Sequence, residues 1–159
     1  MAKKSAGGTP ATVVLDRAGV AYTLHSYAHD AQNSHFGEEA AAALGVSRDR
    51  IFKTLVADVG GELVVAVVPV ARQLDLKALA AAAGGKRAVL ADPAAAARST
   101  GYVVGGISPL GQRTRLRTFL DASAEQFTTI FVSAGKRGLQ VELAPADLVR
   151  LTGADLAVL

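Results

Sequence analysis

The strongest constraint on the fold is a pair of apolar segments separated by two glycines. Residues 51–59 and 62–68 are rich in valine, leucine and other apolar residues, and Gly60 and Gly61 stand between them. Two β-forming segments joined by two residues that readily adopt positive φ are typical of a β-hairpin. We therefore expect an antiparallel pair of strands here, which Pro69 ends.

The rest of the chain alternates between helical and strand patterns. Helices are predicted at residues 10–19, 37–45, 74–83 and 145–151, and another begins at Asp92 and Pro93. Strands are predicted at residues 22–27, 88–90, 118–120, 129–133 and 140–143. Because some strands follow one another directly while others are separated by helices, the sequence predicts an α+β domain with a mixed sheet.

The composition excludes several classes of protein. The chain has 159 residues and no cysteine, so a disulfide framework, a thiolate nucleophile and a Cys-based zinc site are excluded. The length and the 50% hydrophobic content fit one globular domain, expected at residues 10–159 after a flexible tail at residues 1–9. No apolar run approaches the roughly 20 residues that span a bilayer, and the polar start is unlike a signal peptide. We expect a cytoplasmic protein with no membrane partner.

The charge distribution offers candidate contacts to nucleic acid. The net charge is +3, which is compatible with a nucleic-acid partner but does not require one. Arg113, Arg115 and Arg117 lie in a short stretch without acidic residues, and Lys136 and Arg137 follow later. These five cations are candidate phosphate contacts.

Lys53 is a charged residue in an otherwise apolar strand. With a period of two it shares a face with Leu55 and Ala57. An ammonium group there is costly unless it is paired, exposed at a strand end or used in function. The structural interpretation is an edge lysine whose amine reaches solvent. The functional interpretation is a cation that holds a substrate carbonyl or ribose-phosphate oxygen and stabilises negative charge developing on a scissile ester.

A turn that contains two glycines is the second candidate. The residues are Gly105, Gly106, Ile107, Ser108 and Pro109, which follow a strand-like segment at 102–104. Glycines let a substrate approach the backbone closely, and free N–H groups in such a turn can bind an oxyanion. An ordinary tight turn is the alternative, because paired glycines are common in turns.

The histidines and aromatic residues near the N-terminus favour structural roles. His25, His29 and His35 lie within eleven residues, but no neighbouring carboxylates have ligand spacing, so we expect no metal site. Tyr27 and Phe36 lie on either side of the intervening loop. They are candidates for the wall of a pocket or for the core.

Ser133 closes a predicted strand beside a basic turn. It lacks the sequence context of a serine-hydrolase nucleophile. We expect its hydroxyl to bond the backbone or a ligand.

Four segments, taken together, point to a known family. They are FKTL at residues 52–55, PVARQLDL at 69–76, RSTGYVVGGISPLG at 98–111 and VSAGKRGL at 132–139. They closely resemble the YbaK/EbsC family of free-standing aminoacyl-tRNA deacylases, which is related to the editing domain inserted in bacterial prolyl-tRNA synthetase. The match runs in order from about residue 11 to residue 152, and its third segment is the most specific.

This resemblance implies a fold and an activity. The fold is the YbaK-like one, a mixed, barrel-like sheet flanked by short helices in a single domain. The activity is trans-editing, in which the ester of Cys-tRNA(Pro) mischarged by prolyl-tRNA synthetase is hydrolysed in concert with that synthetase. Mischarged tRNA and the synthetase are the implied partners, and no cofactor is implied. In cysteine-specific members the substrate's own thiol attacks its carbonyl, so the protein needs no nucleophile of its own.

The resemblance also implies roles for particular residues. Lys53 matches the family's essential lysine, which positions the aminoacyl-tRNA end. The loop against which the ester is held is matched by residues 105–109. The family's pocket residues are matched by Tyr27, Phe36, Thr54, Gly105 and Ser133.

Two positions depart from the family pattern. Gln140 stands where close relatives carry Asp, and Ala134 stands where they carry Gly. A carboxylate beside the substrate ammonium is thereby missing, which leaves the amino-acid selectivity open. Deacylation of Ala- or Ser-tRNA is one alternative function. A non-catalytic module that binds tRNA or the synthetase is another, motivated by the arginines at 113, 115 and 117.

Overall fold

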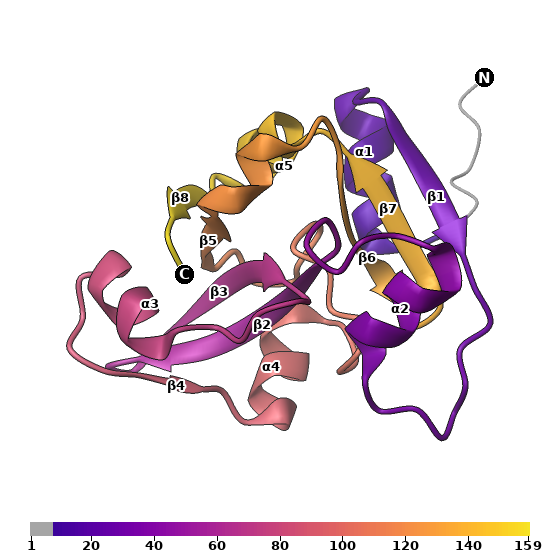
Figure 1. Ribbon diagram of the computed structural model, residues 1–159. Coiled ribbons are helices and arrows are strands. Elements are labelled where there is room, and N and C mark those ends of the chain that lie inside the picture. The colour runs from indigo at the N-terminus through magenta and orange to yellow at the C-terminus, as the bar shows by residue number, and fades with distance from the viewer. Residues whose placement is uncertain (1–7) are drawn as a thin grey trace.

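The computed structural model of the protein describes residues 8–159, which form helices and two β-sheets (Figure 1). Most of the expected tail falls in residues 1–7, outside the described residues. Thr9, at the end of that stretch, is buried and caps the first helix, because its hydroxyl accepts the N–H of Thr12 and donates to the carbonyl of Ala134.

The elements agree closely with those predicted from the sequence. The helices are α1 (Pro10–Ala18), α2 (Phe36–Leu44), α3 (Leu76–Ala82), α4 (Pro93–Thr100) and α5 (Pro145–Thr152), with a 3-10 helix η1 (Ala122–Gln126). The strands are β1 (Tyr22–Ser26), β2 (Phe52–Val59), β3 (Glu62–Pro69), β4 (Ala88–Leu90), β5 (Arg117–Asp121), β6 (Ile130–Lys136), β7 (Leu139–Leu143) and β8 (Asp155–Ala157). The expected α+β domain is confirmed.

The predicted hairpin is the central structural unit. β2 and β3 pair antiparallel, from Phe52 opposite Pro69 to Val59 opposite Glu62. Gly60 and Gly61 form the turn with φ values of 60° and 96°, which only glycine adopts without strain. Pro69 occupies the last paired position of β3 and does not follow the strand.

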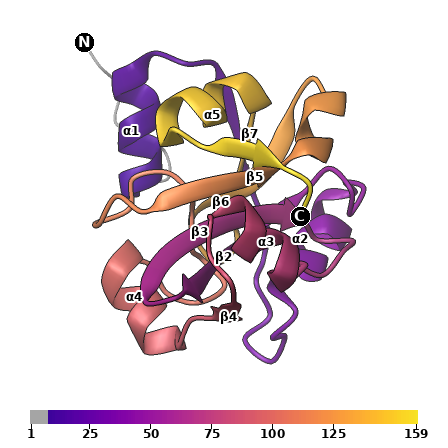
Figure 2. The same cartoon turned by 90° about the vertical axis from the view of Figure 1, so that its left-hand side faces the viewer.

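The strands form two open sheets, which corrects the expectation of a barrel-like sheet. One sheet has the order β4-β2-β3-β5-β8 and the other β1-β7-β6. Figure 2 shows β5, β3, β2 and β4 following one another across the larger sheet. A barrel needs a continuous ladder around its circumference. Here a single parallel bridge between Ile51 and Phe131 links the two sheets within residues 8–159, so neither sheet closes.

The hairpin is buried on both faces. Val65 and Val67 of β3 face a core shared with α1 and the smaller sheet. Val64 and Val68, on the other face, pack with Leu79 of α3. Coverage of both faces explains why residues 62–68 form a continuous apolar run without the alternation of a half-exposed strand.

Some local expectations were wrong or incomplete. The strand-like segment 102–104 is not a strand but part of a turn, in which the N–H of Gly106 donates to the carbonyl of Val103. Asp92 precedes α4 as predicted, but its side chain makes no capping hydrogen bond. The strand β8 and the helix η1 were not predicted. Within residues 8–159, no helix combines the length and the apolar character needed to cross a lipid bilayer.

Candidate functional site

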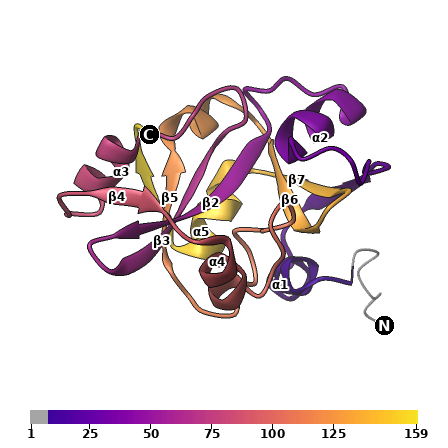
Figure 3. The ribbon, with the colours of Figure 1, turned by 90° about the horizontal axis from the view of Figure 1, so that it is seen from below.

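A pocket of about 370 Å³ lies between α2, the first half of β2 and the start of α4. Seen from below, α2 and α4 lie on opposite sides of β2 (Figure 3). Residues of the turn at 104–107 complete one wall, and Ser133 and Gln140 of the smaller sheet close the inner end. The volume is in the range of small-molecule sites. We call this cavity the α2–α4 pocket.

The pocket lies at an open edge of β2. The short strand β4 pairs only with Ala57–Val59, and the last contact along that edge is the N–H of Ala91, which donates to the carbonyl of Val56 at 2.9 Å. Main-chain groups two residues apart point to the same edge of a strand. The N–H and C=O of Thr54 therefore face the pocket side. This edge position also explains how side chains from both faces of β2, Lys53 and Thr54, line one cavity.

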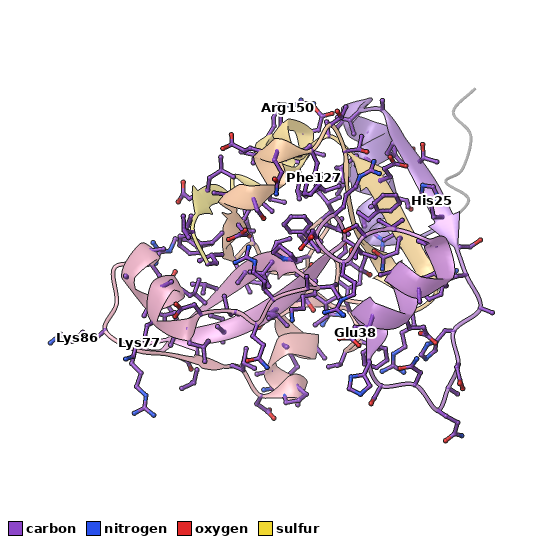
Figure 4. The ribbon with its side chains drawn as sticks, in the orientation of Figure 1. His25, Glu38, Lys77, Lys86, Phe127 and Arg150 are labelled. Carbon is purple, nitrogen blue, oxygen red and sulfur yellow. The ribbon has the colours of Figure 1, made fainter. Side chains whose placement is uncertain are left out.

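Lys53 is a partly buried cation in this pocket. Burial lowers the pKa of its amine, and the carboxylate of Glu38 opposes this effect. Glu38 projects from the side of α2 that faces α4 (Figure 4). No ion pair or hydrogen bond of the Lys53 amine is present within residues 8–159, since Glu38 acts on it only at longer range. The amine is available to an oxygen of a ligand.

Gly105 and Gly106 cannot be replaced by larger residues without strain, because other segments of the chain pack closely against both of them. A Cβ on Gly105, whose φ is +87°, would lie 2.6–2.8 Å from ring carbons of Phe36. A Cβ on Gly106 would lie 2.8 Å from the Cα of Lys136. Within the described residues, no backbone carbonyl accepts the N–H of Gly105 or Ile107, and both residues line the pocket. Both N–H groups are therefore candidates to donate a hydrogen bond to a ligand.

Arg137 contacts both the turn at residues 104–107 and the start of α2. Its Nε donates to the carbonyl of Val104 at 2.9 Å, and its guanidinium carbon lies 4.7 Å from the centroid of the Phe36 ring. The ring of Phe36 thus packs against both Gly105 and Arg137. These contacts join three separate chain segments at the pocket rim, so the rim is held in place before any ligand binds.

Two acceptors in the pocket have no partner. Thr54 Oγ1 and Gln140 Oε1 are buried and make no hydrogen bond within residues 8–159. Gln140 is 7% exposed, and both residues line the pocket. Buried polar atoms are almost always hydrogen-bonded, because leaving them unpaired is costly. Because both residues line the pocket, these atoms are candidates to accept a hydrogen bond from a ligand.

Of the ten predicted site residues, six line the pocket, namely Phe36, Lys53, Thr54, Gly105, Ile107 and Ser133. The hydroxyl of Ser133 accepts the N–H of Gly135 at 3.2 Å, so it stabilises the backbone at the end of β6.

The other four do not line the pocket. Burial raises the pKa of the Tyr27 hydroxyl, and polar contacts with the backbone of Gly138 and the side chain of Gln140 partly offset this effect. The side chain of Tyr27 therefore contacts the side chain of Gln140. Ser108 is fully buried, and its hydroxyl accepts the N–H of Leu110 at 3.2 Å. Pro109 and Gly106 are buried in the same turn.

The arginines at 113, 115 and 117 do not form one cationic surface. Arg117 makes two hydrogen bonds to Glu62, at 3.1 and 3.2 Å, and a third to the carbonyl of Ala83. Arg113 packs beside Gly101 at the end of α4, and Arg115 beside Gly153 at the end of α5. The three side chains contact different elements. Of the candidate phosphate contacts, Arg137 lies at the pocket rim, where it contacts Val104 and Phe36.

The pocket also has lining residues that were not among the predicted site residues, including His35, Glu38, Leu90, Pro93 and Val104. Their positions depend on which segments meet around β2, which local patterns do not specify. The one available signal was that His35 and Glu38 adjoin the predicted pocket residue Phe36.

The remaining histidines have carboxylate partners. His25 Nε2 lies 2.9 Å from Glu142, and His29 Nδ1 lies 2.6 Å from Glu39. Each histidine thus has a different partner. No group of three or more His, Asp or Glu side chains suited to a metal ion occurs in the part of the chain that the structure describes.

Comparison with known proteins identifies the family. Residues 32–151 match the model of the aminoacyl-tRNA editing domain. The chain is 40% identical over 157 residues to "Putative Cys-tRNA(Pro)/Cys-tRNA(Cys) deacylase EbsC" of Enterococcus faecalis, and the match covers 98% of this chain and 94% of that protein.

Solved structures share the fold. The crystal structure of "a putative trans-editing enzyme for prolyl tRNA synthetase" superposes with a TM-score of 0.80 at 25% identity, covering 94% of this chain and 93% of the other. The hypothetical protein APE2540 superposes with a TM-score of 0.83 at 27% identity, covering 94% and 97%. The match to the family model over most of the chain and the 40% identity to EbsC agree with the resemblance of the four sequence segments. This protein belongs to the aminoacyl-tRNA editing domain family.

Proposed function

We propose that the protein is a trans-editing deacylase that hydrolyses the ester of Cys-tRNA(Pro) formed in error by prolyl-tRNA synthetase. The observation that carries this proposal is an unpaired lysine amine, Lys53, in the same pocket as the two free N–H groups of Gly105 and Ile107. The names of the relatives support the substrate class. Mischarged tRNA is the proposed substrate, the synthetase the proposed partner and the cytoplasm the proposed location.

The groups in the pocket suit an ester that is already activated. An aminoacyl ester needs positioning and charge stabilisation more than it needs a strong protein nucleophile. In the proposed reaction the thiol of the cysteinyl group attacks its own carbonyl carbon. The ester C–O bond then breaks, the terminal ribose hydroxyl leaves with the thiol proton, and water opens the resulting cyclic thioester. Lys53 holds the ribose-phosphate or carbonyl oxygen, while the N–H groups of Gly105 and Ile107 stabilise the oxyanion.

The unpartnered acceptors fit the amino end of the substrate. An aminoacyl ester carries an ammonium group with three donors. Thr54 Oγ1 and Gln140 Oε1 are buried acceptors in the pocket, and we assign them to this ammonium. Both are neutral, so they attract the cation less strongly than a carboxylate would.

The weaker acceptor set bears on which amino acid is removed. Binding alone separates side chains that differ by one methylene-sized group by only about 1–3 kcal/mol. A reaction that uses the substrate thiol discriminates further, because alanine, serine and proline lack one. The alternative is a deacylase for Ala- or Ser-tRNA, motivated by the neutral Gln140 and by Ala134.

A panel of mischarged tRNAs tests these functions. Hydrolysis of Cys-, Ala-, Ser- and Pro-tRNA(Pro) is followed with and without prolyl-tRNA synthetase. We expect Cys-tRNA(Pro) to be cleaved much faster than the other three. Cleavage of Ala- or Ser-tRNA(Pro) without cleavage of Cys-tRNA(Pro) would favour the alternative. Strong tRNA binding without any turnover would favour a non-catalytic module, whose binding should weaken steeply with salt.

A further inference from the structure

An arginine next to the start of β2 links the two sheets. The Nε of Arg50 donates to the carbonyl of Thr129 at 2.8 Å, and a terminal nitrogen of its guanidinium donates to the Glu142 carboxylate at 3.0 Å. Its guanidinium carbon lies 5.1 Å from the centroid of the Phe131 ring. Phe131 and Glu142 belong to β6 and β7 of the smaller sheet. We call Arg50, Thr129 and Glu142 the inter-sheet clamp.

The backbone of Arg50 makes the same connection. Its carbonyl accepts the N–H of Phe131 at 3.1 Å, next to the bridge between Ile51 and Phe131 that links the two sheets within residues 8–159. Ile51 itself lines the pocket. Of the ion pairs in the part of the chain that the structure describes, that of Arg50 and Glu142 is the one that joins the start of β2 to the smaller sheet. Arg50 therefore holds this junction through both its backbone and its side chain.

The pocket is built across the same junction. Lys53 comes from β2 of the larger sheet, whereas Ser133 and Gln140 come from β6 and β7 of the smaller one. Side chains two residues apart along a strand lie on the same face. Glu142 therefore shares a face of β7 with Gln140, and Phe131 shares a face of β6 with Ser133. The separation between Lys53 and Gln140 depends on how the two sheets meet at the inter-sheet clamp.

Glu142 is held by side chains on both sides of β7. The hydroxyl of Thr129 donates to one carboxylate oxygen at 2.6 Å, and Nε2 of His25 lies 2.9 Å from the other. The hydrogen bond from Thr129, with that of His25 and the charge of Arg50, holds the pKa of the Glu142 carboxyl below its usual value, although partial burial opposes this. His25 is directly opposite Gln140 in the pairing of β1 with β7. The clamp thus fixes β7 beside Gln140.

We propose that Arg50 and Glu142 are positioning residues, which hold Gln140 at the distance from Lys53 that the reaction requires. This inference rests on the proposed function, in which Gln140 accepts a hydrogen bond from the substrate ammonium while Lys53 holds an oxygen of the same substrate. Neither Arg50 nor Glu142 lines the pocket, so both act through the placement of Gln140. Small changes in the geometry of groups that hold one substrate have large effects on its rate of reaction.

Arg117 offers a matched control, because it makes the same kinds of contact within one sheet. It donates to Glu62 at 3.1 Å and to the carbonyl of Ala83 at 2.6 Å, and its guanidinium carbon lies 5.5 Å from the centroid of the Phe119 ring. Glu62 and Arg117 belong to β3 and β5, which are both in the larger sheet, and neither lines the pocket. Arg117→Met therefore removes a similar set of contacts and leaves the junction of the sheets intact.

A double-mutant cycle on Cys-tRNA(Pro) hydrolysis tests the coupling to Gln140. Arg50→Met keeps an apolar stem but removes the charge and the donors. It should lower kcat/KM about tenfold in the wild-type background and less than about twofold when Gln140→Ala is already present, because the side chain to be positioned is then absent. Arg117→Met should leave kcat/KM unchanged in both backgrounds. An Arg50→Met effect that is absent, or equal in the two backgrounds, would overturn the proposal.

Two variants of Glu142 provide a second test, which does not depend on the folding of Arg50→Met. Glu142→Gln keeps an oxygen that can accept from Arg50, whereas Glu142→Ala keeps none. Glu142→Gln should retain most of the wild-type kcat/KM, and Glu142→Ala should lose about tenfold. Equal kcat/KM values in these two variants would contradict a positioning role.

NMR tests the inter-sheet clamp without any substrate. The side-chain amide signals of Gln140 are assigned by their loss in Gln140→Ala. Arg50→Met should broaden these signals, since Gln140 then samples several positions, and Arg117→Met should leave them unchanged. Unchanged signals in Arg50→Met would overturn the clamp even if the protein is a deacylase. Absence of Cys-tRNA(Pro) hydrolysis by the wild type, together with broadened signals in Arg50→Met, would refute the proposed function and leave the placement of Gln140 by the clamp supported.

Discussion

At the scale of single residues, the pocket holds polar groups that the free protein leaves without partners. Thr54 Oγ1 and Gln140 Oε1 accept no hydrogen bond, and the amine of Lys53 makes no ion pair, within residues 8–159. Each of these groups opposes folding, because it has left water without gaining a partner. A ligand with an ammonium donor and an oxygen acceptor would satisfy all three.

Thr54→Val tests whether one such unpaired acceptor lowers the stability of the free protein and whether it binds the substrate. Valine has nearly the same shape but no hydroxyl, so the variant should be as stable as the wild type or up to about 1 kcal/mol more stable in denaturant unfolding. Its KM for Cys-tRNA(Pro) should rise. Thr118→Val is the control, because the Thr118 hydroxyl donates to the carbonyl of Leu116 at 3.1 Å. That variant should lose stability and keep its activity, and a loss of stability in Thr54→Val with unchanged KM would contradict the assignment.

Lys53 should make stability depend on pH in the alkaline range. Burial lowers its pKa from 10.5 in the folded state, so the unfolded chain binds more protons between the lowered pKa and 10.5. The free energy of unfolding of the wild type should therefore rise with pH in this window relative to Lys53→Met. Below the window Lys53→Met should be the more stable protein. Urea unfolding across this range measures the difference, and a difference independent of pH would contradict a buried cation.

At the scale of elements, the rim of the pocket depends on contacts between α2 and the Gly105 turn. Phe36 at the start of α2 packs on Gly105 and on the guanidinium of Arg137, whose Nε also holds Val104. Displacing the Phe36 ring would move one wall of the pocket and loosen the turn that offers the N–H groups. Small changes of geometry at such a site have large effects on rate.

Gly105→Ala tests this coupling between elements. The added methyl would meet the Phe36 ring at 2.6–2.8 Å, at a φ of +87°, so we expect a deacylation rate reduced at least about tenfold and some loss of stability. Gly60→Ala is the control, since Gly60 also has a positive φ, of +60°, but nothing lies within 4 Å of its Cβ position. It should lose a similar backbone energy of about 1–2 kcal/mol and keep full activity. Equal deacylation rates in the two variants would contradict a role for the packing of Phe36 on Gly105 in catalysis.

The elements themselves were predictable because their signals are local. The hairpin at 52–69 follows from two β-rich segments and two glycines, and the helices follow from proline at their starts and glycine at their ends. The expectation of a barrel-like sheet was wrong because the closure of a sheet depends on pairing between strands that are distant in the sequence. The pocket residues Leu90, Pro93 and Val104 were missed for a similar reason. Leucine, proline and valine in a sequence are interpreted as core or turn, and only the meeting of β4, α4 and the Gly105 turn places them around one pocket.

At the scale of the whole molecule, Asp121 ties together distant parts of the chain. It is 2% exposed, and its carboxylate accepts the N–H of Leu159 at 2.9 Å, the hydroxyl of Ser123 and the guanidinium of Arg72. Burial alone would raise the pKa of Asp121, but these hydrogen bonds and the charge of Arg72 hold it below the usual 3.8. The carboxylate thus connects the end of the chain to η1 and to the segment before α3.

Asp121→Asn should therefore lower stability at neutral pH, by about 1–3 kcal/mol. A carboxylate with a lowered pKa contributes stability that is full above its ordinary pKa and is lost as the pH falls through the folded-state value. The difference between variant and wild type should accordingly shrink below about pH 4. Asp155→Asn, at an exposed position of β8, should show no such difference. A deficit in Asp121→Asn that persists unchanged into acid would contradict the charged network.

The most direct test of the account is the single-turnover rate of Cys-tRNA(Pro) hydrolysis by Lys53→Ala. Lys77→Ala is the control, because Lys77 is an exposed lysine on α3, far from α2 (Figure 4). Lys53→Ala should fold normally and lose at least about a hundredfold in rate, while Lys77→Ala should match the wild type. A folded Lys53→Ala protein that cleaves Cys-tRNA(Pro) at the wild-type rate would contradict the assignment of Lys53 as the group that holds the aminoacyl-tRNA end.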